Sequence, residues 1–199
     1  MTRYKDGHKQ ETRDAILRNA AQRFRRDGIG GTGVRALMAD AGLTHGTFYA
    51  HFPSRAELIA AAVEYAAEST LGYFEKVLSA VPEDERLQTF IYRYLRHQHR
   101  KHVELGCTAA ALAPDIARES AETRTRFAEK TNRLVDLISS LLPDGGTPDQ
   151  RSIRAKTVFA LMMGTLQLMR IETDNSAAES LMNEGREAAF RLATRAWEA

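Results

Sequence analysis

A short stretch of the chain concentrates hydroxyl, imidazole and phenol side chains that could contact nucleic acid. Such groups hydrogen-bond to phosphate oxygens and read base edges in the major groove of DNA, and arginines add contacts to phosphates. The pattern predicts base contacts from Thr44, His45 and the close backbone approach at Gly46, and phosphate or groove-rim contacts from the others. The candidate DNA-binding residues are Arg35, Thr44, His45, Gly46, Thr47, Tyr49, His51 and Arg55.

Two short helices joined by a tight turn are expected to position these side chains. Val34, Leu37 and Met38 recur at helical spacing, which predicts an apolar stripe on a first helix. Gly42 follows, where the chain can take a positive φ without a Cβ clash. The hydroxyl of Thr44 is suited to cap a second helix over residues 44–51. This layout is typical of a helix-turn-helix, whose second helix enters the major groove.

Other elements follow from similar signals. The sequence predicts a first helix over about residues 10–26 and a further helix over about residues 84–102. Thr147, Pro148 and Gln150 predict a capping box at the start of a later helix. Arg3, Lys5 and Lys9 precede the first helix and are candidates for an arm onto the DNA backbone or minor groove.

The helix-turn-helix region resembles the N-terminal domain of the TetR family of transcriptional repressors, over about residues 13–63. The matching elements are Thr32, Val34-Arg35, Ala41-Gly42-Leu43-Thr44, Gly46-Thr47-Phe48-Tyr49, His51-Phe52-Pro53-Ser54-Arg55 and Glu57-Leu58. The resemblance implies an all-α fold of about nine helices. It also implies a three-helix helix-turn-helix domain over residues 1–53, followed by a larger helical bundle over residues 54–199 for ligand binding and dimerisation.

Composition and charge fit this interpretation. The chain has 199 residues and a net charge of +2, with 43% hydrophobic and 27% charged residues. Residues 1–60 hold ten Lys and Arg against six Asp and Glu, whereas residues 61–199 hold eighteen against twenty. A basic module on a slightly acidic body is the charge pattern expected of a DNA reader. The polar N-terminus, the single cysteine and the lack of a long apolar run predict a cytoplasmic protein with no membrane partner.

The resemblance further implies a homodimer that binds a palindromic DNA operator through two copies of the reading helix. The family dimerises through its last two helices, and two stripes of apolar and small residues occur there. The candidate interface residues are Val158, Leu161, Met162, Thr165, Leu166, Met169, Leu181, Gly185, Ala188, Leu192 and Ala196. A face buried inside one chain would show the same pattern, so both alternatives remain open at this stage.

A small-molecule inducer that releases the DNA is the other partner that the resemblance implies. A pocket for it would be mostly apolar with a few polar groups. The candidate lining residues are Tyr65, Phe74, Phe90, Tyr94, Leu95, Cys107, Leu112, Phe127, Phe159 and Met163. Ordinary core packing is the alternative for each of them. The overall prediction is a ligand-responsive regulator, with repression as its expected output.

Two other hypotheses involve Cys107 and the nearby histidines. A cysteine at a helix N-terminus has a lowered thiol pKa, which would suit a sensor of oxidants or electrophiles. Packing as a small hydrophobe is the commoner role of a lone cysteine. His99 and His102 share a helical face and could, with Cys107, support a metal-dependent helical enzyme. A solvated basic helix explains these histidines better, so we expect no metal, no cofactor and no enzymatic activity.

Overall fold

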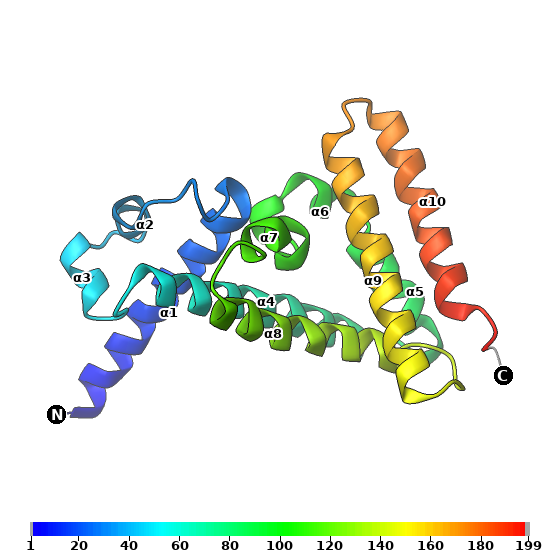
Figure 1. The fold of residues 1–199 in the computed structure, drawn as a ribbon, viewed down its shortest axis with the longest axis horizontal. Helices are drawn as coiled ribbons and strands as arrows, with labels where there is room; N and C mark the ends of the chain where they lie inside the picture. Colours follow the sequence, from blue (N-terminus) through cyan, green and yellow to red (C-terminus); the bar gives the residue numbers. More distant parts are fainter. Residues whose placement is uncertain (1, 198–199) are drawn as a thin grey trace. The chain divides into compact units, whose positions relative to one another are not determined.

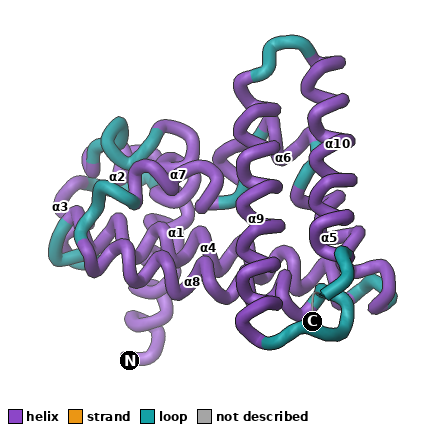
Figure 2. The backbone as a smooth tube through the Cα atoms, turned by 45° about the vertical axis from the view of Figure 1, so that its right-hand side comes forward, coloured by secondary structure: helices purple, strands orange, loops and turns teal. Residues whose placement is uncertain are grey.

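The computed structural model describes residues 2–197, with side chains from Lys9 onward. The prediction of an all-α fold is confirmed, because the described residues form ten α-helices and two short 3₁₀-helices. Figures 1 and 2 show these helices joined by loops, without a strand in the described part of the chain. The described helices include none that is long and apolar enough to cross a lipid bilayer.

The helices belong to two compact units, which are described separately. The first unit comprises residues up to 69 and residues 103–128, and the second comprises residues 70–102 and 129–199. The helices of the first unit are α1 (Thr2–Asp27), α2 (Val34–Asp40), α3 (His45–Tyr49), the first part of α4 (Arg55–Ser79), η2 (Val103–Leu105), α7 (Thr108–Ile116) and the start of α8 (Ala121–Ser140). Helix α1 therefore begins well before residue 10, where the sequence pattern placed its start.

The core of the first unit is built from the apolar faces of these helices. Its largest fully buried side chains are Ile16, Phe24, Ile29, Leu37, Met38, Phe48, Phe52, Leu58 and Ile59. Helix α3 has only five residues, too few to be stable alone, so packing must hold it. Phe48 on α3 stacks on Phe52, with ring centroids 6.0 Å apart, and both rings are buried. These two anchors fix the orientation of α3.

Arginines with several partners join separate segments within the first unit. Arg126 on α8 donates hydrogen bonds to Glu64 and Glu57 of α4, with shortest distances of 2.9 Å to each. The hydrogen bonds to Glu64 and Glu57 raise the pKa of the Arg126 guanidinium. Arg25 on α1 is buried and donates to the Glu104 carbonyl oxygen at 2.7 Å and to the Thr108 hydroxyl at 3.3 Å. Burial lowers the pKa of Arg25.

The second unit contains the end of α4, η1 (Glu83–Glu85), α5 (Arg86–Tyr94), α6 (His97–Lys101), the rest of α8, α9 (Pro148–Ile171) and α10 (Asn175–Thr194). Helices α9 and α10 lie side by side as a hairpin (Figures 1 and 2). A capping box begins α9, because Thr147 accepts from the Gln150 amide while Gln150 accepts from the Thr147 amide. This cap confirms the prediction made for residues 147–150.

One helix predicted over about residues 84–102 is broken in the structure. Helix α5 ends at Tyr94 and α6 begins at His97. The Nδ1 atom of His99 lies 2.6 Å from the carbonyl oxygen of Tyr94, within hydrogen-bonding distance, and its ring packs edge-on against the tyrosine ring. This contact gives the Tyr94 carbonyl oxygen, at the end of α5, a hydrogen-bond partner. The break in the helix therefore leaves this carbonyl paired. Helical periodicity alone could not reveal a contact of this kind.

Candidate nucleic-acid interface

The turn between α2 and α3 adopts the predicted geometry. Gly42 has a φ of +68°, in the left-handed region that favours glycine. Thr44 has an extended backbone and precedes the first helical residue of α3. Its Oγ1 accepts a hydrogen bond from the Thr47 amide at 3.4 Å and lies 2.9 Å from the Thr47 hydroxyl. The cap predicted for Thr44 is therefore present, and it fixes where α3 begins.

The outer side of α3 is open to solvent. Thr44, His45 and Gly46 are exposed, and Thr47 is half-buried. Tyr49 is 66% exposed, although its ring contacts Phe48 edge-on with centroids 5.0 Å apart. The ring of His45 also meets Tyr49 edge-on at 5.7 Å. Packing against buried Phe48 thus orients two exposed rings, which leaves a pre-ordered polar surface that could meet a DNA groove.

The two arginines predicted to contact phosphates have different surroundings. Arg35 on α2 is exposed, and no described residue pairs with it. Arg55 instead donates through Nη2 to the Ile29 carbonyl oxygen at 2.7 Å and to the Thr32 carbonyl oxygen at 3.4 Å. The structure therefore gives Arg55 a role inside the first unit, which its sequence position could not show.

A basic group formed by two side chains of α1 lies beside His51. Lys9 and Arg13 follow at i, i+4 spacing on α1, and both act electrostatically on the half-buried imidazole of His51. Burial, followed by these two cations, lowers the pKa of His51. The guanidinium of Arg13 also lies 4.8 Å from the centre of the Phe52 ring. Lys9 was predicted as part of an arm onto DNA, whereas for Arg13 the i, i+4 spacing was the signal available in the sequence. The predicted arm residues Arg3 and Lys5 lie outside the described side chains.

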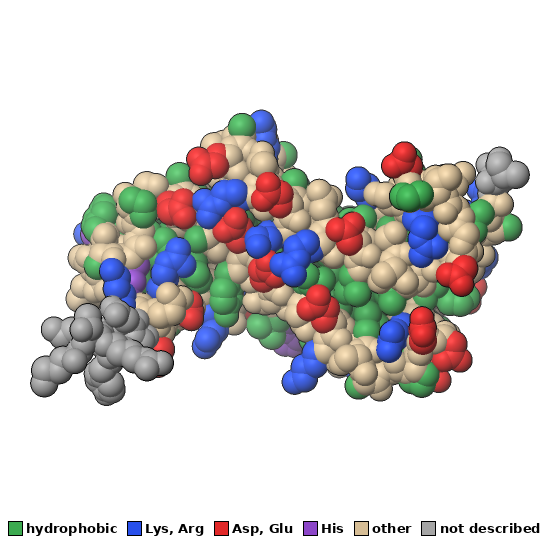
Figure 3. Space-filling view, turned by 90° about the horizontal axis from the view of Figure 1, so that it is seen from below, with side chains coloured by type: hydrophobic (Ala, Val, Ile, Leu, Met, Phe, Trp, Pro, Cys, Tyr) green, Lys and Arg blue, Asp and Glu red, His purple; other side chains and the backbone are tan. Residues whose placement is uncertain are grey.

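Two other arginines of α1 are engaged in ion pairs. Arg23 pairs with Asp40 and with Asp27, and Arg26 pairs with Asp27 at 2.9 Å. On the face shown in Figure 3, Lys and Arg side chains are interspersed with Asp and Glu side chains. The positive charge that could meet phosphates is therefore local, and it centres on the cations near α3 that have no acidic partner.

The predicted ligand-lining residues are distributed over both compact units. Tyr65, Cys107, Leu112 and Phe127 belong to the first unit, whereas Phe74, Phe90, Tyr94, Leu95, Phe159 and Met163 belong to the second. All of these side chains are buried except Tyr65 and Met163, which are half-buried. In the second unit, Phe74 and Phe90 pack with ring centroids 4.4 Å apart, and Tyr94 meets Phe159 at 5.9 Å. These contacts are those of a packed aromatic core.

Cys107 and the histidines do not form a metal cluster. No group of three or more His, Cys, Asp or Glu residues in the described part of the chain could hold a metal ion. His99 is buried and engaged with Tyr94, as described above. Cys107 is buried at the residue before α7.

The candidate dimer residues divide into two groups. Val158, Met162, Thr165, Leu166, Met169 and Gly185 are buried inside the chain, where α9 packs on α10. Leu161, Leu181, Ala188 and Leu192 are half-buried, and Ala196 is exposed. The residues of the first group were candidates for contact with a second protomer, but they pack within the chain, because α9 is apolar on two sides. The opposite side of α9 exposes Ile153, Ala160, Gly164, Leu168 and Ile171.

Comparisons with known proteins agree with this geometry. Residues 16–62 match the family described as "Bacterial regulatory proteins, tetR family". The chain is 25% identical over 137 residues to the HTH-type transcriptional repressor KstR2 of Mycolicibacterium smegmatis, a match that covers 67% of this chain and 66% of the relative.

Solved structures show the same fold. Reduced NemR from E. coli superposes with a TM-score of 0.76 at 19% identity, covering 94% of this chain and 100% of that structure. FadR from Bacillus subtilis, in complex with stearoyl-CoA, superposes with a TM-score of 0.67 at 13% identity, covering 92% of this chain and 98% of FadR. Residues 16–62 therefore carry the helix-turn-helix of the TetR family of bacterial regulatory proteins, within an all-helical fold that NemR and FadR share.

Proposed function

We propose that the chain is a homodimeric, ligand-responsive repressor that binds a palindromic operator and is released from it by a small-molecule inducer. The exposed, pre-oriented polar side of α3 is the observation that carries this proposal. KstR2, a relative of the chain, is named as a repressor, which supports repression as the output. A regulator of this kind needs no catalytic group and no cofactor, and it works where DNA is, in the cytoplasm.

In this proposal α3 lies in the major groove. Thr44 and His45 contact base edges, where the missing side chain of Gly46 lets the backbone approach closely. The other contacts go to phosphates, from Arg35 on α2 and from Thr47, Tyr49 and His51. Lys9 and Arg13 add positive charge beside His51. Arg55 acts indirectly, by holding the segment between α1 and α2.

The proposed dimer uses the outward side of α9 together with the adjoining edge of α10. Ile153 is 65% exposed, Leu168 is 53% exposed and Ile171 is 75% exposed. With Ala160 and Gly164 between them, these residues recur at helical spacing along one side of α9. Leu181, Ala188 and Leu192 form a half-buried stripe on α10. Contiguous exposed apolar residues of this kind mark protein interfaces, and a two-fold pair of hairpins would cover them.

We assign DNA binding to residues 1–53, and ligand binding and dimerisation to residues 54–199. The two compact units do not coincide with this division, because residues 54–69 and 103–128 pack with the N-terminal helices. A change in these residues would therefore reach the DNA-binding helices directly. This arrangement supports a response in which a ligand alters DNA binding, and the stearoyl-CoA complex of FadR shows that a protein of this fold can hold a small molecule.

The decisive experiment selects bound sequences from a random duplex pool with the purified full chain. We expect a palindromic consensus, bound with a sequence preference over random DNA of about a thousandfold or more. Tyr49→Ala should weaken binding to the selected duplex by about tenfold or more while leaving the melting temperature unchanged. Tyr92→Ala, which removes another exposed tyrosine outside the helix-turn-helix, is the matched control. Enrichment of no sequence, or equal effects of the two substitutions, would contradict the proposal.

A further inference from the structure

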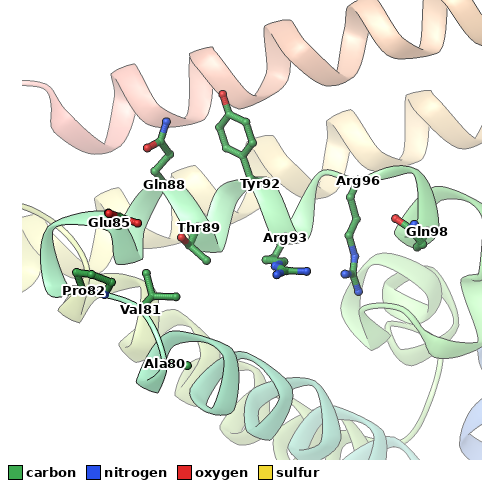
Figure 4. A pocket seen from close by; sticks show the side chains of 10 residues that line it. All are labelled: Ala80, Val81, Pro82, Glu85, Gln88, Thr89, Tyr92, Arg93, Arg96 and Gln98. Carbon is green, nitrogen blue, oxygen red and sulfur yellow. The ribbon is translucent and has the colours of Figure 1, made fainter.

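A groove with a volume of about 740 Å³ lies along the outer side of α5 in the second unit. Its walls come from the turn after α4, from η1 and α5, and from the segment that leads into α6 and the start of that helix. Ala80, Val81 and Pro82 contribute an apolar surface (Figure 4). None of the residues predicted to line a ligand pocket lies in this groove, so it is a separate feature from the aromatic core.

Two arginines give one end of the groove a positive charge. Arg93 and Arg96 are three residues apart and extend to the same side of the chain (Figure 4). Arg93 is exposed, and among the described residues it has no ion pair or hydrogen bond. No described carboxylate pairs with Arg96 either. Arg23 and Arg26, by contrast, are paired with acids.

The side chain of Arg96 is held in place, but one of its hydrogen-bond donors has no acceptor among the described residues. Its guanidinium lies 5.4 Å from the centre of the Tyr73 ring, a cation–π contact that orients it. Its Nε is buried and has no hydrogen-bond partner among the described residues. A buried donor without an acceptor is costly, and such groups commonly pair with a ligand or a water molecule. The planar guanidinium fork matches a carboxylate or a phosphate.

The other residues that line the groove indicate the chemical character of the rest of the ligand. Thr89 lies one helical turn before Arg93, and Gln98 follows Arg96, so neutral hydrogen-bonding groups adjoin the arginines. Glu85 lies at the far end, about 12 Å from Arg93 along the helix axis. That carboxylate would repel a second anionic group there. The groove therefore suits one anionic group attached to a short body that is apolar.

We propose that this groove binds a small organic anion, a carboxylate or a phosphate monoester. Its charged group lies between Arg93 and Arg96, and its apolar body lies on Val81 and Pro82. The proposal goes beyond the repressor function, because it assigns a ligand class to a surface that stands outside the aromatic core. Binding is measured without DNA, so its failure is distinguishable from a failure of operator binding.

The test is isothermal titration of the full chain with octanoate, octyl phosphate, octanol and octylamine, all below their micelle-forming concentrations. We expect both anions to bind, with affinities that fall as salt rises, and the alcohol and amine to bind at least about tenfold more weakly. Tighter binding of octyl phosphate would identify a phosphate ligand, and tighter binding of octanoate a carboxylate. Binding of the alcohol as tight as that of the anions, or no binding of any probe, would overturn the proposal.

Substitutions locate the site. Arg93→Ala with Arg96→Ala should weaken anion binding by about tenfold or more. Arg118→Ala with Arg191→Ala removes the same charge from two exposed arginines elsewhere and should leave binding unchanged. Arg96→Lys keeps the charge but not the planar fork, and should bind with intermediate affinity. Equal loss in the two double variants would show a general charge effect and overturn the assignment. Circular dichroism checks that each variant is folded.

Discussion

Arg55 Nη2 donates a hydrogen bond of 2.7 Å to the carbonyl oxygen of Ile29, and so ties the first turn of α4 to the segment between α1 and α2. The same Nη2 reaches the Thr32 carbonyl oxygen at 3.4 Å. Thr32 is buried, and its hydroxyl donates to the Gly28 carbonyl oxygen at 2.9 Å. The first turn of α4 and the segment between α1 and α2 therefore meet at one guanidinium. An arginine committed to these carbonyls is a positioning residue for the DNA-binding helices.

Arg55→Ala should destabilise the protein rather than remove a phosphate contact. Loss of the guanidinium removes hydrogen bonds to two carbonyl oxygens, although that of Ile29 still accepts from the Thr32 amide at 3.4 Å. We expect the free energy of unfolding to fall by about 1–3 kcal/mol. The dependence of operator affinity on salt should keep its slope, because that slope counts neutralised phosphates. Urea unfolding measures the first effect, and DNA titrations at several salt concentrations measure the second.

Arg35→Ala is the matched control, because Arg35 is exposed and unpaired within the described residues. It should leave stability unchanged and lower the magnitude of the salt slope by about 1. If Arg55→Ala instead lowers the slope and spares the stability, Arg55 contacts a phosphate and the hydrogen bonds to Ile29 and Thr32 are dispensable.

Close packing of α9 on α10 depends on Gly185. A Cβ atom at this position would approach Thr165 Cγ2 to 2.4 Å, although Gly185→Ala is favourable for helix propensity. We expect the substitution to destabilise the protein by about 1–3 kcal/mol in urea unfolding, because the helices must move apart. Gly72→Ala is the control, since no neighbouring atom lies within 4 Å of a Cβ there. Thr165→Ala should relieve the clash, so a double variant as unstable as Gly185→Ala would contradict this explanation.

The proposed dimer interface predicts that charge on the outer side of α9 separates the protomers. Leu168→Glu with Ile171→Glu places two carboxylates in an apolar contact, and should raise the dimer dissociation constant by about a hundredfold or more. Light scattering after gel filtration measures the mass. Leu105→Glu is the control, because Leu105 is 66% exposed outside α9 and α10. A double variant that remains a dimer would place the interface elsewhere.

Features set by neighbouring residues in the chain were predictable from the sequence. Thr44 caps α3, Gly42 takes a positive φ and Thr147 forms its capping box with Gln150, because each depends on residues within one turn. Partners distant in the chain were not predictable. The periodicity of α9 showed that Thr165 lies on an apolar side, but Gly185 in α10 decides that this side is internal.

The break between α5 and α6 and the hydrogen bonds of Arg55 were not predicted from the sequence, and both omissions have the same physical origin. The break between α5 and α6 depends on an imidazole that meets a carbonyl across the break. The role of Arg55 depends on carbonyls more than twenty residues away. Sequence spacing reports which side of a helix a residue occupies, but not which partner covers that side. The exposure of polar side chains on α3 was predictable, because such groups on a short capped helix need no distant partner.

His51 should make the protein less stable in mild acid. Burial, and then Lys9 and Arg13, depress its pKa in the folded state below the ordinary value of 6.5. Below that value the unfolded chain binds more protons than the folded chain, so stability falls as pH drops through about 6.5 towards the folded pKa. His51→Gln should remove this part of the pH dependence of urea unfolding. His97→Gln, which replaces an exposed histidine of α6, is the control.

DNA binding should shift the same group in the opposite direction. A phosphate near His51 favours the imidazolium, so its pKa rises in the complex and operator binding takes up a proton. Operator affinity should therefore increase as pH falls from 8 to 6, and less so in His51→Gln. The imidazole proton resonances of His51, followed by NMR with and without the duplex, measure the shift directly. An unchanged pKa in the complex would remove His51 from the phosphate-contacting group.

Trp197, the single tryptophan of the chain, reports on the loop between α8 and α9. Its Nε1 donates to the Asp144 carbonyl oxygen at 3.1 Å, and the Arg154 guanidinium lies 3.4 Å from the ring centre. Gly146 has a φ of +70°, and a Cβ there would lie 2.5 Å from Trp197 Cε3. Gly146→Ala should therefore displace the ring into water and shift its fluorescence to longer wavelength.

The strained φ should lower the free energy of unfolding of Gly146→Ala by about 1 kcal/mol or more. Gly30→Ala provides the control, because its Cβ would meet no atom within 4 Å and its φ is not in the left-handed region. An iodide-quenching measurement separates two explanations for any spectral change. If the ring has left the loop, quenching rises; if only its neighbours have moved, quenching stays as in the unsubstituted protein. Unchanged emission in Gly146→Ala would mean that Trp197 does not occupy the glycine surface in solution.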